Sequence, residues 1–428
     1  MRFLIYSANF APDLAGIGKY SGDMAAWLVE QGHQVHVVTA PPYYPNWRVH
    51  GDYPRRRYTR EIWRGVAVWR APLWVPRRPT GLTRILHLVS FAITSAPTML
   101  RQVFWRPNVV LTVAPAFVCA PMGWLAARLC GARAWLHLQD FEVDMAFQLG
   151  MLKGKRLRRL VLRMERAGLR RFDCVSSISN RMVELLVKKG VPSQRTRFFP
   201  NWVDTSCIVP SPSNTRYRTQ LGIPPEAVVV LFSGSLGGKQ GLMMIPAVAR
   251  LLADRAEVVF VICGDGIMKR ELTLATINQT NVRMLPLQPL ERLGELLNMA
   301  DIHLLPQSPC ATDLVMPSKL SGMMASGRPV IATCHMGTEI DSVVSQCGVV
   351  VPPEDSEATA KAVMRLVQQP ALRRELGRRA RVLAEDRFER NAVLGRVFGS
   401  VGANTPSNTF GLDPIETHEQ PVTHDHAA

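Results

Sequence analysis

The chain has 428 residues, of which 47% are apolar, and its formal net charge is +17. This length exceeds what one hydrophobic core usually fills, and the apolar content is enough for two, so the composition argues against a disordered or single-domain chain. The 8 cysteines form no C-x-x-C pair and no nearby set with histidines, which favours reduced thiols in a cytoplasmic protein over disulfides or a structural metal.

The first half of the chain predicts a parallel α/β domain over residues 1–200. Short apolar runs alternate with stretches of helical period, as strands and crossover helices do. The expected strands cover residues 3–7, 35–40, 66–72, 109–114, 134–139 and 174–179. The first run is too short for a secretion signal, and the longest apolar stretches are short or interrupted by proline, so we expect neither a leader nor a transmembrane helix.

A second α/β domain is predicted over residues 226–375, after a linker at 201–225 that is rich in proline, serine and asparagine. Its strands are expected at residues 228–234, 258–264, 282–288, 301–307, 329–334 and 349–353. Charged helices over 376–402 are expected to fold back across the linker, and the polar, aperiodic residues 403–428 predict a disordered tail. The expected architecture is therefore α/β, with two Rossmann-like domains facing across a cleft.

Positive charge gathers in the first domain, at Arg55, Arg56, Arg57, Arg77, Arg78 and along residues 153–171. Such a field favours an anionic partner, although a solvated helix face is an equally good interpretation of residues 153–171. Residues 83–107 mix apolar, aromatic and basic side chains as a helix in a bilayer interface does, which favours an anionic membrane surface. No nucleic-acid-binding module accompanies the charge, so nucleic acid is not an expected partner.

A glycine loop follows the first strand, where Gly16 and Gly18 precede a predicted helix. Glycine allows close backbone approach, and a helix N-terminus offers free N–H groups to an anion. The second strand ends at Thr39 without the acidic residue that a dinucleotide ribose requires. We therefore expect a nucleotide other than NAD.

In the second domain, three segments that follow predicted strands are expected to meet at the carboxyl edge of the sheet. Backbone N–H groups and two lysines there can hold a diphosphate, although the first of these loops could also be a tight turn with a surface lysine. The sequence has no D-x-D motif, so we expect helix N-termini and lysines to meet the charge without a metal ion. The candidate donor-binding residues are Gly234, Ser235, Lys239, Gly264, Asp265, Asp313, Ser318 and Lys319, with Ser318 expected to cap the helix that follows it.

Acidic residues follow the strand at 134–139 in the first domain. Because side chains alternate along a strand, His137 and Gln139 share one face, while Asp140, Glu142 and Asp144 fall in the loop beyond. The pattern fits either an acceptor site at the sheet edge or a loop that caps a helix, and we favour the site.

Several strings together resemble the GT-B glycosyltransferases of the large retaining family 4, over residues 1 to about 400. The strings GIGKY, TAPPYYPNW, LHLQDFEVD, FFPNW, SGSLGGKQGL and DLVMPSKL narrow the likeness to exopolysaccharide fucosyltransferases of the colanic acid type. The resemblance implies a GDP-sugar donor, GDP-fucose in particular, and a lipid-linked glycan acceptor at the cytoplasmic face of the bacterial inner membrane. It also implies retention of configuration, with no cofactor.

Three departures from the family pattern affect the expected site. The paired glutamates of the E-x7-E motif are replaced by Leu314 and Gly322, and Asp313 and Glu339 are our substitutes for them in donor binding. Ser235 and Gln240 occupy the positions of the usual Arg and Lys in the diphosphate loop, which leaves Lys239 one place out of register. The usual His of the acceptor-side H-D pair is Gln139, with Asp140 retained.

These observations give one mechanistic hypothesis. Lys239 and Lys319 hold the donor diphosphate, His137 and Asp140 orient the acceptor hydroxyl, and the departing phosphate accepts its proton. Two alternatives stay open: another donor, such as GDP-mannose or a UDP-sugar, and an inactive, membrane-bound scaffold of a polysaccharide assembly complex.

Overall fold

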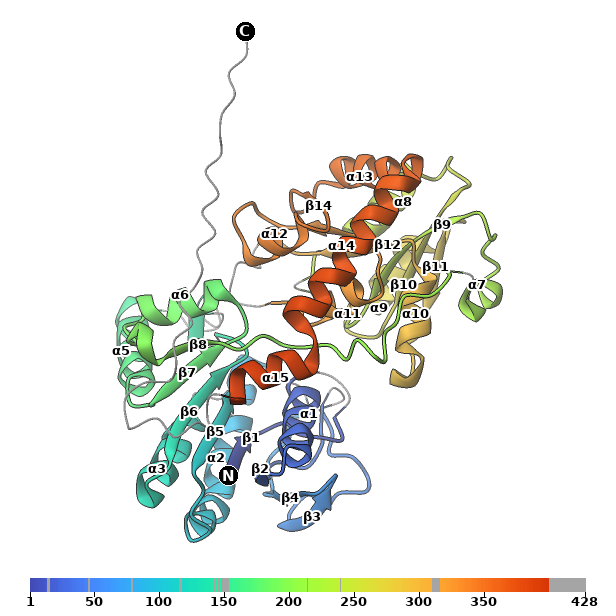
Figure 1. The fold of residues 1–428 in the computed structure, drawn as a ribbon. Helices are drawn as coiled ribbons and strands as arrows, with labels where there is room; N and C mark the ends of the chain where they lie inside the picture. Colours follow the sequence, from blue (N-terminus) through green and yellow to red (C-terminus); the bar gives the residue numbers. More distant parts are fainter. Residues whose placement is uncertain are drawn as a thin grey trace.

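The computed structural model describes residues 1–13, 16–44, 47–77, 80–114, 118–141, 143–144, 147, 154–213, 215–238, 240–309 and 316–399. Lys239, Asp313, Glu142 and the expected tail lie outside these ranges. Two parallel sheets flanked by helices make up the described chain, so the predicted α/β class is confirmed (Figure 1).

The sheet of the first domain has 8 strands in the order β3-β4-β2-β1-β5-β6-β7-β8. Every neighbouring pair is parallel except β3 and β4 at one edge. The strands are β1 (Arg2–Ser7), β2 (Gln34–Thr39), β3 (Thr59–Trp63), β4 (Val66–Arg70), β5 (Val109–Ala114), β6 (Arg133–Leu138), β7 (Cys174–Ser177) and β8 (Thr196–Phe198). All six expected strands are present; the short edge strands β3 and β8 were not predicted, because neither has a sustained apolar run.

Helices cover both faces of this sheet, which is why its central strands are apolar along their whole length. They are α1 (Gly16–Glu30), α2 (Gly81–Val103), α3 (Ala120–Cys130), α5 (Lys155–Leu169) and α6 (Asn180–Lys188), with a short 3-10 turn η1 (Ser193–Arg195). The long helix α2 begins at a capping box formed by Thr80 and Thr83. The helix expected within residues 83–107 is therefore present as α2 and has a defined start.

The sheet of the second domain is entirely parallel, in the order β11-β10-β9-β12-β13-β14. Its strands are β9 (Val228–Ser233), β10 (Val258–Cys263), β11 (Val282–Leu285), β12 (Ile302–Pro306), β13 (Val330–Thr333) and β14 (Gly348–Val351). The chain reverses its direction of winding between β9 and β12. In doubly wound sheets, ligands bind outside the carboxyl ends of the two strands at that point.

The helices of the second domain are mostly short. They are α7 (Arg216–Gln220), α8 (Met244–Leu251), α9 (Lys269–Thr276), α10 (Leu293–Met299), α11 (Lys319–Ala325), α12 (Glu339–Val344) and α13 (Ser356–Gln368), with a 3-10 turn η2 (Leu290–Arg292). Helix α11 follows β12, and α12 follows β13. Both therefore begin at the same edge of the sheet as the loop after β9.

The last two helices, α14 (Pro370–Phe388) and α15 (Arg390–Gly399), belong to different cores. Helix α14 packs against the second domain, whereas α15 lies beside the first (Figure 1). At the crossing, the Val203 amide donates to the Phe388 carbonyl and the Arg390 amide donates to the Val203 carbonyl. The Phe398 ring then packs against the Trp135 ring, with their centroids 5.4 Å apart. The chain thus crosses between the domains twice, and the two crossings are hydrogen-bonded to each other.

None of the helices in the described part of the chain combines the length and the apolar character needed to cross a bilayer.

Candidate functional site

Two glycine loops meet at the carboxyl ends of β9 and β10. The Gly234 amide donates to the Cys263 carbonyl over 2.9 Å, and the Leu236 amide donates to the Asp265 carbonyl over 2.8 Å. A Cβ atom on Gly264 would lie 1.9 Å from the Gly234 carbonyl oxygen, so only glycine fits there. The predicted proximity of these two loops is confirmed, and its cause is backbone contact at glycine.

Lys319 extends from the start of α11 to the same loop. Its ammonium donates to the Gln240 side chain over 3.2 Å and lies 3.9 Å from the centroid of the Phe232 ring. No described carboxylate forms a salt bridge with it. Burial lowers the pKa of the Lys319 ammonium to about 7. The loop after β9 therefore has a cation to which no described carboxylate is paired, as an anion site requires.

Ser318 connects the two domains instead of capping its helix. It occupies the N-cap position of α11, but its backbone is already helical (φ −60°, ψ −19°), and its side chain makes no capping bond. An N-cap side chain needs an extended backbone to reach the free N–H groups, so the expected cap is wrong. The hydroxyl instead hydrogen-bonds Tyr20 of α1, in the first domain.

Glu339 forms a second contact between the domains. From the first turn of α12, its carboxylate accepts a bond from the Asn180 side chain and another from the Arg181 backbone N–H, each 3.2 Å long. These donors lie at the N-terminus of α6, where the helix dipole favours a negative charge. The structure thus directs Glu339, one of the expected donor-binding residues, toward the first domain.

A small cavity of about 10 Å³ also lies where the two domains meet. Ile178 and Asn201 line it from the first domain and the linker, and Met316, Ser318 and Ser321 from the second. The segment around Ser318, at the start of α11, is therefore at the junction of the domains.

We expect Glu339→Gln to loosen this junction. Replacing the carboxylate by an amide removes the charge assistance from two hydrogen bonds, which costs about 1 kcal/mol. Small-angle scattering of the ligand-free protein should show a larger radius of gyration than the wild type. Asp341→Asn is the matched control, because Asp341 lies in the same helix but accepts from Gly337 within its own domain. Equal scattering curves for all three proteins would contradict the interpretation.

Two further candidates, in the loops after β9 and β10, are exposed. Ser235 is exposed, with no hydrogen bond in the described structure. Asp265 is also exposed, where it accepts from the Gly266 N–H and from Lys269. The Gly266 N–H, and then Lys269, lower the pKa of the Asp265 carboxyl. The negative charge of Asp265 is thus compensated locally.

Gly16 and Gly18 lie in the first turn of α1 and not in a loop before it, so the expected helix start is wrong; Asp13, just before the helix, is a buried acid. A Cβ atom on Gly18 would lie 2.5 Å from the Asp13 Cβ, so glycine at 18 makes room for Asp13. Burial raises the pKa of the Asp13 carboxyl to about 6, although a hydrogen bond from Asn9 and the charge of Arg70 oppose this shift. Gly16 has a φ of +62° and open space at its Cβ position, so a ligand could approach the backbone there. The packing requirement explains Gly18 without a ligand.

His137 lies in the core of the first domain. Its Nδ1 is 2.9 Å from the Ser176 hydroxyl, its Nε2 is 3.0 Å from the Gln139 side chain, and its ring packs on Phe199. Burial lowers the pKa of the imidazole to about 3, so the ring is neutral at physiological pH. Because both ring nitrogens are engaged, this geometry favours a structural role for His137. Gln139, on the same face, lies just beyond the end of β6.

The acidic loop after β6 divides into two parts. Asp140 is half-buried directly after the strand, at the edge of the sheet where the expected acceptor site lies. Asp144 instead pairs with Lys189 over 2.6 Å, and Lys189 also pairs with the buried Glu165 over 2.5 Å. Asp144 thus belongs to a buried ion cluster, which leaves Asp140 as the described acidic candidate.

The departures from the family pattern have structural counterparts. A Cβ atom on Gly322, at the second motif position, would face Leu297 and Ile208, so this position is turned toward apolar packing. Gln240, at the position of the usual loop lysine, contacts Lys319. Sequence reasoning missed Phe232 beneath Lys319 and Tyr20 opposite Ser318. Tyr20 belongs to the GIGKY string, but nothing in a single sequence shows what it contacts.

Among the residues that the structure describes, no three His, Cys, Asp or Glu side chains come close enough to hold a metal ion.

Comparison with known proteins agrees with this geometry. A family model described as a glycosyl transferase 4-like domain matches residues 15–202, and one described as glycosyl transferases group 1 matches residues 213–383. The chain is 39% identical to the colanic acid biosynthesis glycosyl transferase WcaI of Escherichia coli K12 over 381 residues, which cover 86% of this chain and 93% of WcaI. The chain belongs to the GT4-type glycosyltransferases.

Solved structures support the fold of this glycosyltransferase. Sucrose-phosphate synthase of Thermosynechococcus elongatus superimposes with a TM-score of 0.73 at 18% identity, covering 94% of this chain and 98% of the synthase. HepE of Anabaena, in complex with UDP and glucose, gives a TM-score of 0.68 at 15% identity, covering 94% and 99% of the two chains. The predicted GT-B architecture is thereby confirmed, and the protein is an enzyme of the glycosyltransferase class.

Proposed function

We propose that this glycosyltransferase transfers fucose from GDP-fucose, with retention, to a lipid-linked glycan during synthesis of a colanic-acid-like exopolysaccharide. The observation that carries the proposal is the likeness to WcaI, which extends over 93% of that protein. The proposed place of action is the cytoplasmic face of the inner membrane.

The donor side of the proposal rests on Lys319 and the glycine loops. A nucleoside diphosphate leaving group needs positive charge and backbone N–H groups at its phosphates. Lys319 beside Gly234 supplies both, and Lys239 would add a second ammonium from the same loop. We propose that these groups make a divalent metal unnecessary. The departing phosphate then takes the proton of the acceptor hydroxyl on the same face of the sugar, so Asp140 need only position that hydroxyl.

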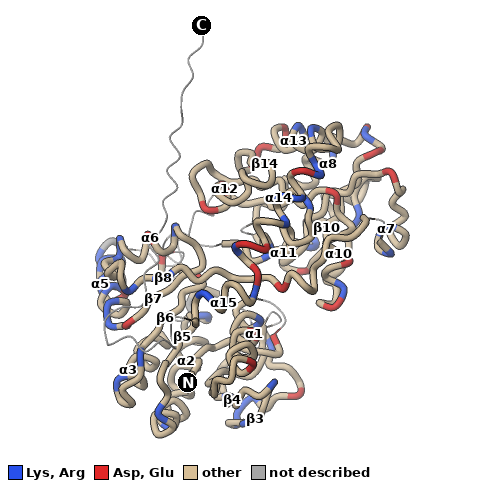
Figure 2. Tube along the Cα trace, viewed as in Figure 1, with Lys and Arg blue, Asp and Glu red and all other residues tan. Residues whose placement is uncertain are grey.

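The acceptor side of the proposal rests on two surfaces of the first domain. Helix α5 exposes Arg156, Arg159 and Arg163 together with the apolar Leu160 and Met164, and Figure 2 shows basic residues gathered over this helix. An apolar stripe is exposed along α2. It is formed at helical spacing by Leu86, Ile93 and Leu100, and by Phe104 at the C-cap. Basic and apolar side chains side by side are suited to an anionic bilayer surface.

One experiment tests donor and acceptor together. The purified protein is incubated with membrane lipid extract and each of several labelled nucleotide sugars, including GDP-fucose, GDP-mannose and UDP-glucose. We expect label to enter lipid from GDP-fucose, and to do so equally with a chelator present. Transfer only from another nucleotide sugar would replace the donor, and loss of transfer with the chelator would overturn the metal-independent mechanism.

An inactive scaffold is the alternative from another class, favoured by the loss of both motif glutamates at Leu314 and Gly322. It predicts that no nucleotide sugar is hydrolysed or transferred, even though the protein binds vesicles. Donor turnover by the purified chain therefore separates the two functions.

A further inference from the structure

A second cavity, of about 750 Å³, lies in the first domain between three segments: residues 47–56, residues 72–77 and helix α2. The first two segments follow β2 and β4, so the cavity opens at the carboxyl edge of the sheet. Its volume is in the range of small-molecule sites. Nothing in the site described above uses its residues.

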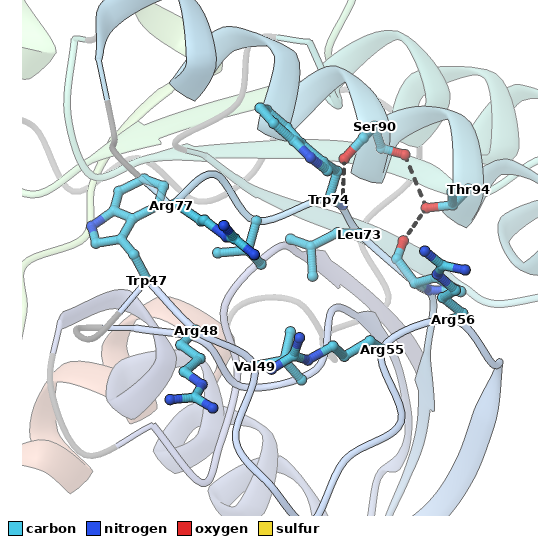
Figure 3. Close-up of a pocket in the computed structure, with 12 residues that line it drawn as sticks. Trp47, Arg48, Val49, Arg55, Arg56, Leu73, Trp74, Arg77, Ser90 and Thr94 are labelled. Atoms are coloured by element: carbon cyan, nitrogen blue, oxygen red, sulfur yellow. Dashed lines mark hydrogen bonds between the residues drawn. The ribbon is translucent and has the colours of Figure 1, made fainter.

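Four arginines line this cavity, as Figure 3 shows: Arg48, Arg55, Arg56 and Arg77. All four are exposed, and none forms a salt bridge with a residue that the structure describes. None of the described residues that line the cavity is acidic. Like charges around one space repel each other, and an anion between them removes that cost. Guanidinium groups bind phosphate oxygens in pairs, which makes a phosphate or diphosphate the anion of best fit.

The remaining wall is apolar and aromatic. Trp47 and Trp74 lie along one side, Leu73 and Val49 lie between the arginines, and α2 closes the cavity (Figure 3). This wall is held in place: the Trp74 amide donates to the Ser90 hydroxyl over 2.9 Å, and the Thr94 hydroxyl bonds the Pro72 carbonyl. Beyond the cavity, Ile93 of α2 is 67% exposed. An inorganic anion would leave this apolar wall unused.

We propose that this cavity binds a diphosphate ester that carries a hydrocarbon chain, with the arginines on the phosphates and the tryptophans and α2 on the start of the chain. The identity of this ligand as the glycosyl acceptor rests on the proposed function; its binding does not. The cavity would hold the phosphate end of a lipid-linked acceptor on the first domain, while the second domain holds the donor.

The test is calorimetric titration of the full-length protein with farnesyl diphosphate, a water-soluble diphosphate ester of a branched hydrocarbon, in the presence of saturating GDP. Excess GDP occupies the donor site, so the titration reports on other sites. We expect binding that is weaker for inorganic diphosphate and absent for farnesol. If GDP abolished the binding of farnesyl diphosphate, the ligand would belong to the donor site and the proposal would fail.

Matched arginine variants give the decisive comparison. The double variant Arg55→Gln/Arg56→Gln removes two charges from the cavity lining. It should weaken the binding of farnesyl diphosphate about tenfold or more. Arg57→Gln changes charge in the same loop but outside the cavity lining, and should stay within about twofold of wild type. An equal loss of farnesyl diphosphate affinity per charge at all three positions would show a general basic surface and overturn the cavity proposal.

Two further arms separate the sources of the phosphate. One arm measures the affinity of wild type and the double variant for vesicles of phosphatidylcholine with phosphatidylglycerol. We expect the two affinities to differ by less than the tenfold expected for farnesyl diphosphate. An equal or larger loss of vesicle affinity would assign the arginines to lipid headgroups and overturn the proposal. Donor hydrolysis in the absence of acceptor should be unchanged in the double variant, while transfer to lipid extract falls. If the double variant transferred sugar like wild type, the cavity proposal would fail and the proposed transferase function would stand. If wild type bound farnesyl diphosphate but turned over no nucleotide sugar, the proposed function would fail and the cavity proposal would stand.

Discussion

Lys319→Ala should lower kcat/KM for the nucleotide sugar by about 10² to 10³, on the scale of losing one preorganised donor to developing charge. The physical reason is the position of the ammonium, which lies against the Phe232 ring and near Gly234, with no counter-ion in the described part of the chain. Its partial burial limits the water that competes for it, so a phosphate that reaches it gains a strong interaction. Steady-state kinetics over a range of donor concentrations measures the change and divides it between kcat and KM.

The matched control is Lys269→Ala. Lys269 also follows a strand at this edge of the sheet, but it is paired with the exposed Asp265 over 3.3 Å. Its removal should change kcat/KM by less than about threefold. Similar losses in both variants would show that the loss comes from the general positive field and would remove Lys319 from the proposed mechanism.

The same lysine predicts a pH dependence for donor binding. Burial lowers the pKa of Lys319 to about 7, so in the free enzyme the ammonium loses its proton as pH rises above that value. Only the protonated form attracts a diphosphate, and donor affinity should therefore fall by up to about tenfold per pH unit above pH 7. Lys319→Arg keeps its charge throughout this range and should flatten the profile. A wild-type profile that is flat from pH 6 to 9 would contradict the assignment.

Gly264→Ala should destabilise the second domain by about 3 kcal/mol, which is roughly 6 to 12 °C in melting temperature for a domain of this size. The added Cβ would meet the Gly234 carbonyl oxygen at 1.9 Å. Because that atom is backbone, the two loops must separate, and the Gly234 amide loses its bond to Cys263. Thermal unfolding with and without GDP should show both a lower melting temperature and a smaller stabilisation by the nucleotide.

Gly237→Ala is the control for this change, because it adds the same methyl group in the neighbouring loop. The nearest atom to a Cβ there is the Ser235 hydroxyl oxygen at 3.9 Å, an ordinary contact. Its melting temperature should stay within about 2 °C of wild type. If Gly264→Ala also melted within that interval, the two loops would not be in the contact described.

Much of the architecture could be predicted from local pattern. Each expected strand is an apolar run bounded by glycine, proline or polar residues, and burial on both faces of a parallel sheet requires such runs. The loops at Gly234 and Gly264 were also found, because glycine at the end of a strand marks close backbone approach. The edge strand β3 has no such run, and α15 could not be assigned to a domain, because its apolar residues do not say which core they enter.

The candidate site was less predictable, since its chemistry depends on neighbours far away in the chain. His137 and Lys319 were both plausible titratable residues at strand and helix ends. The structure separates them: His137 has both ring nitrogens bonded inside the first domain, whereas Lys319 has no carboxylate partner among the residues that the structure describes. Ser318 and Glu339 likewise contact Tyr20 and Asn180 of the other domain, which no local pattern shows.

The sequence by itself determined the class of protein, the two α/β units and the loops that could meet a diphosphate, because periodicity and glycine spacing act over a few residues. Only the tertiary structure decided which charges are compensated. In the sequence, Arg55, Arg56 and Arg77 indicate only an anionic partner of some kind, whereas the fold gathers them with two tryptophans around one cavity. Burial and pairing depend on distances between residues that the chain brings together only when both domains and their crossing helices have formed.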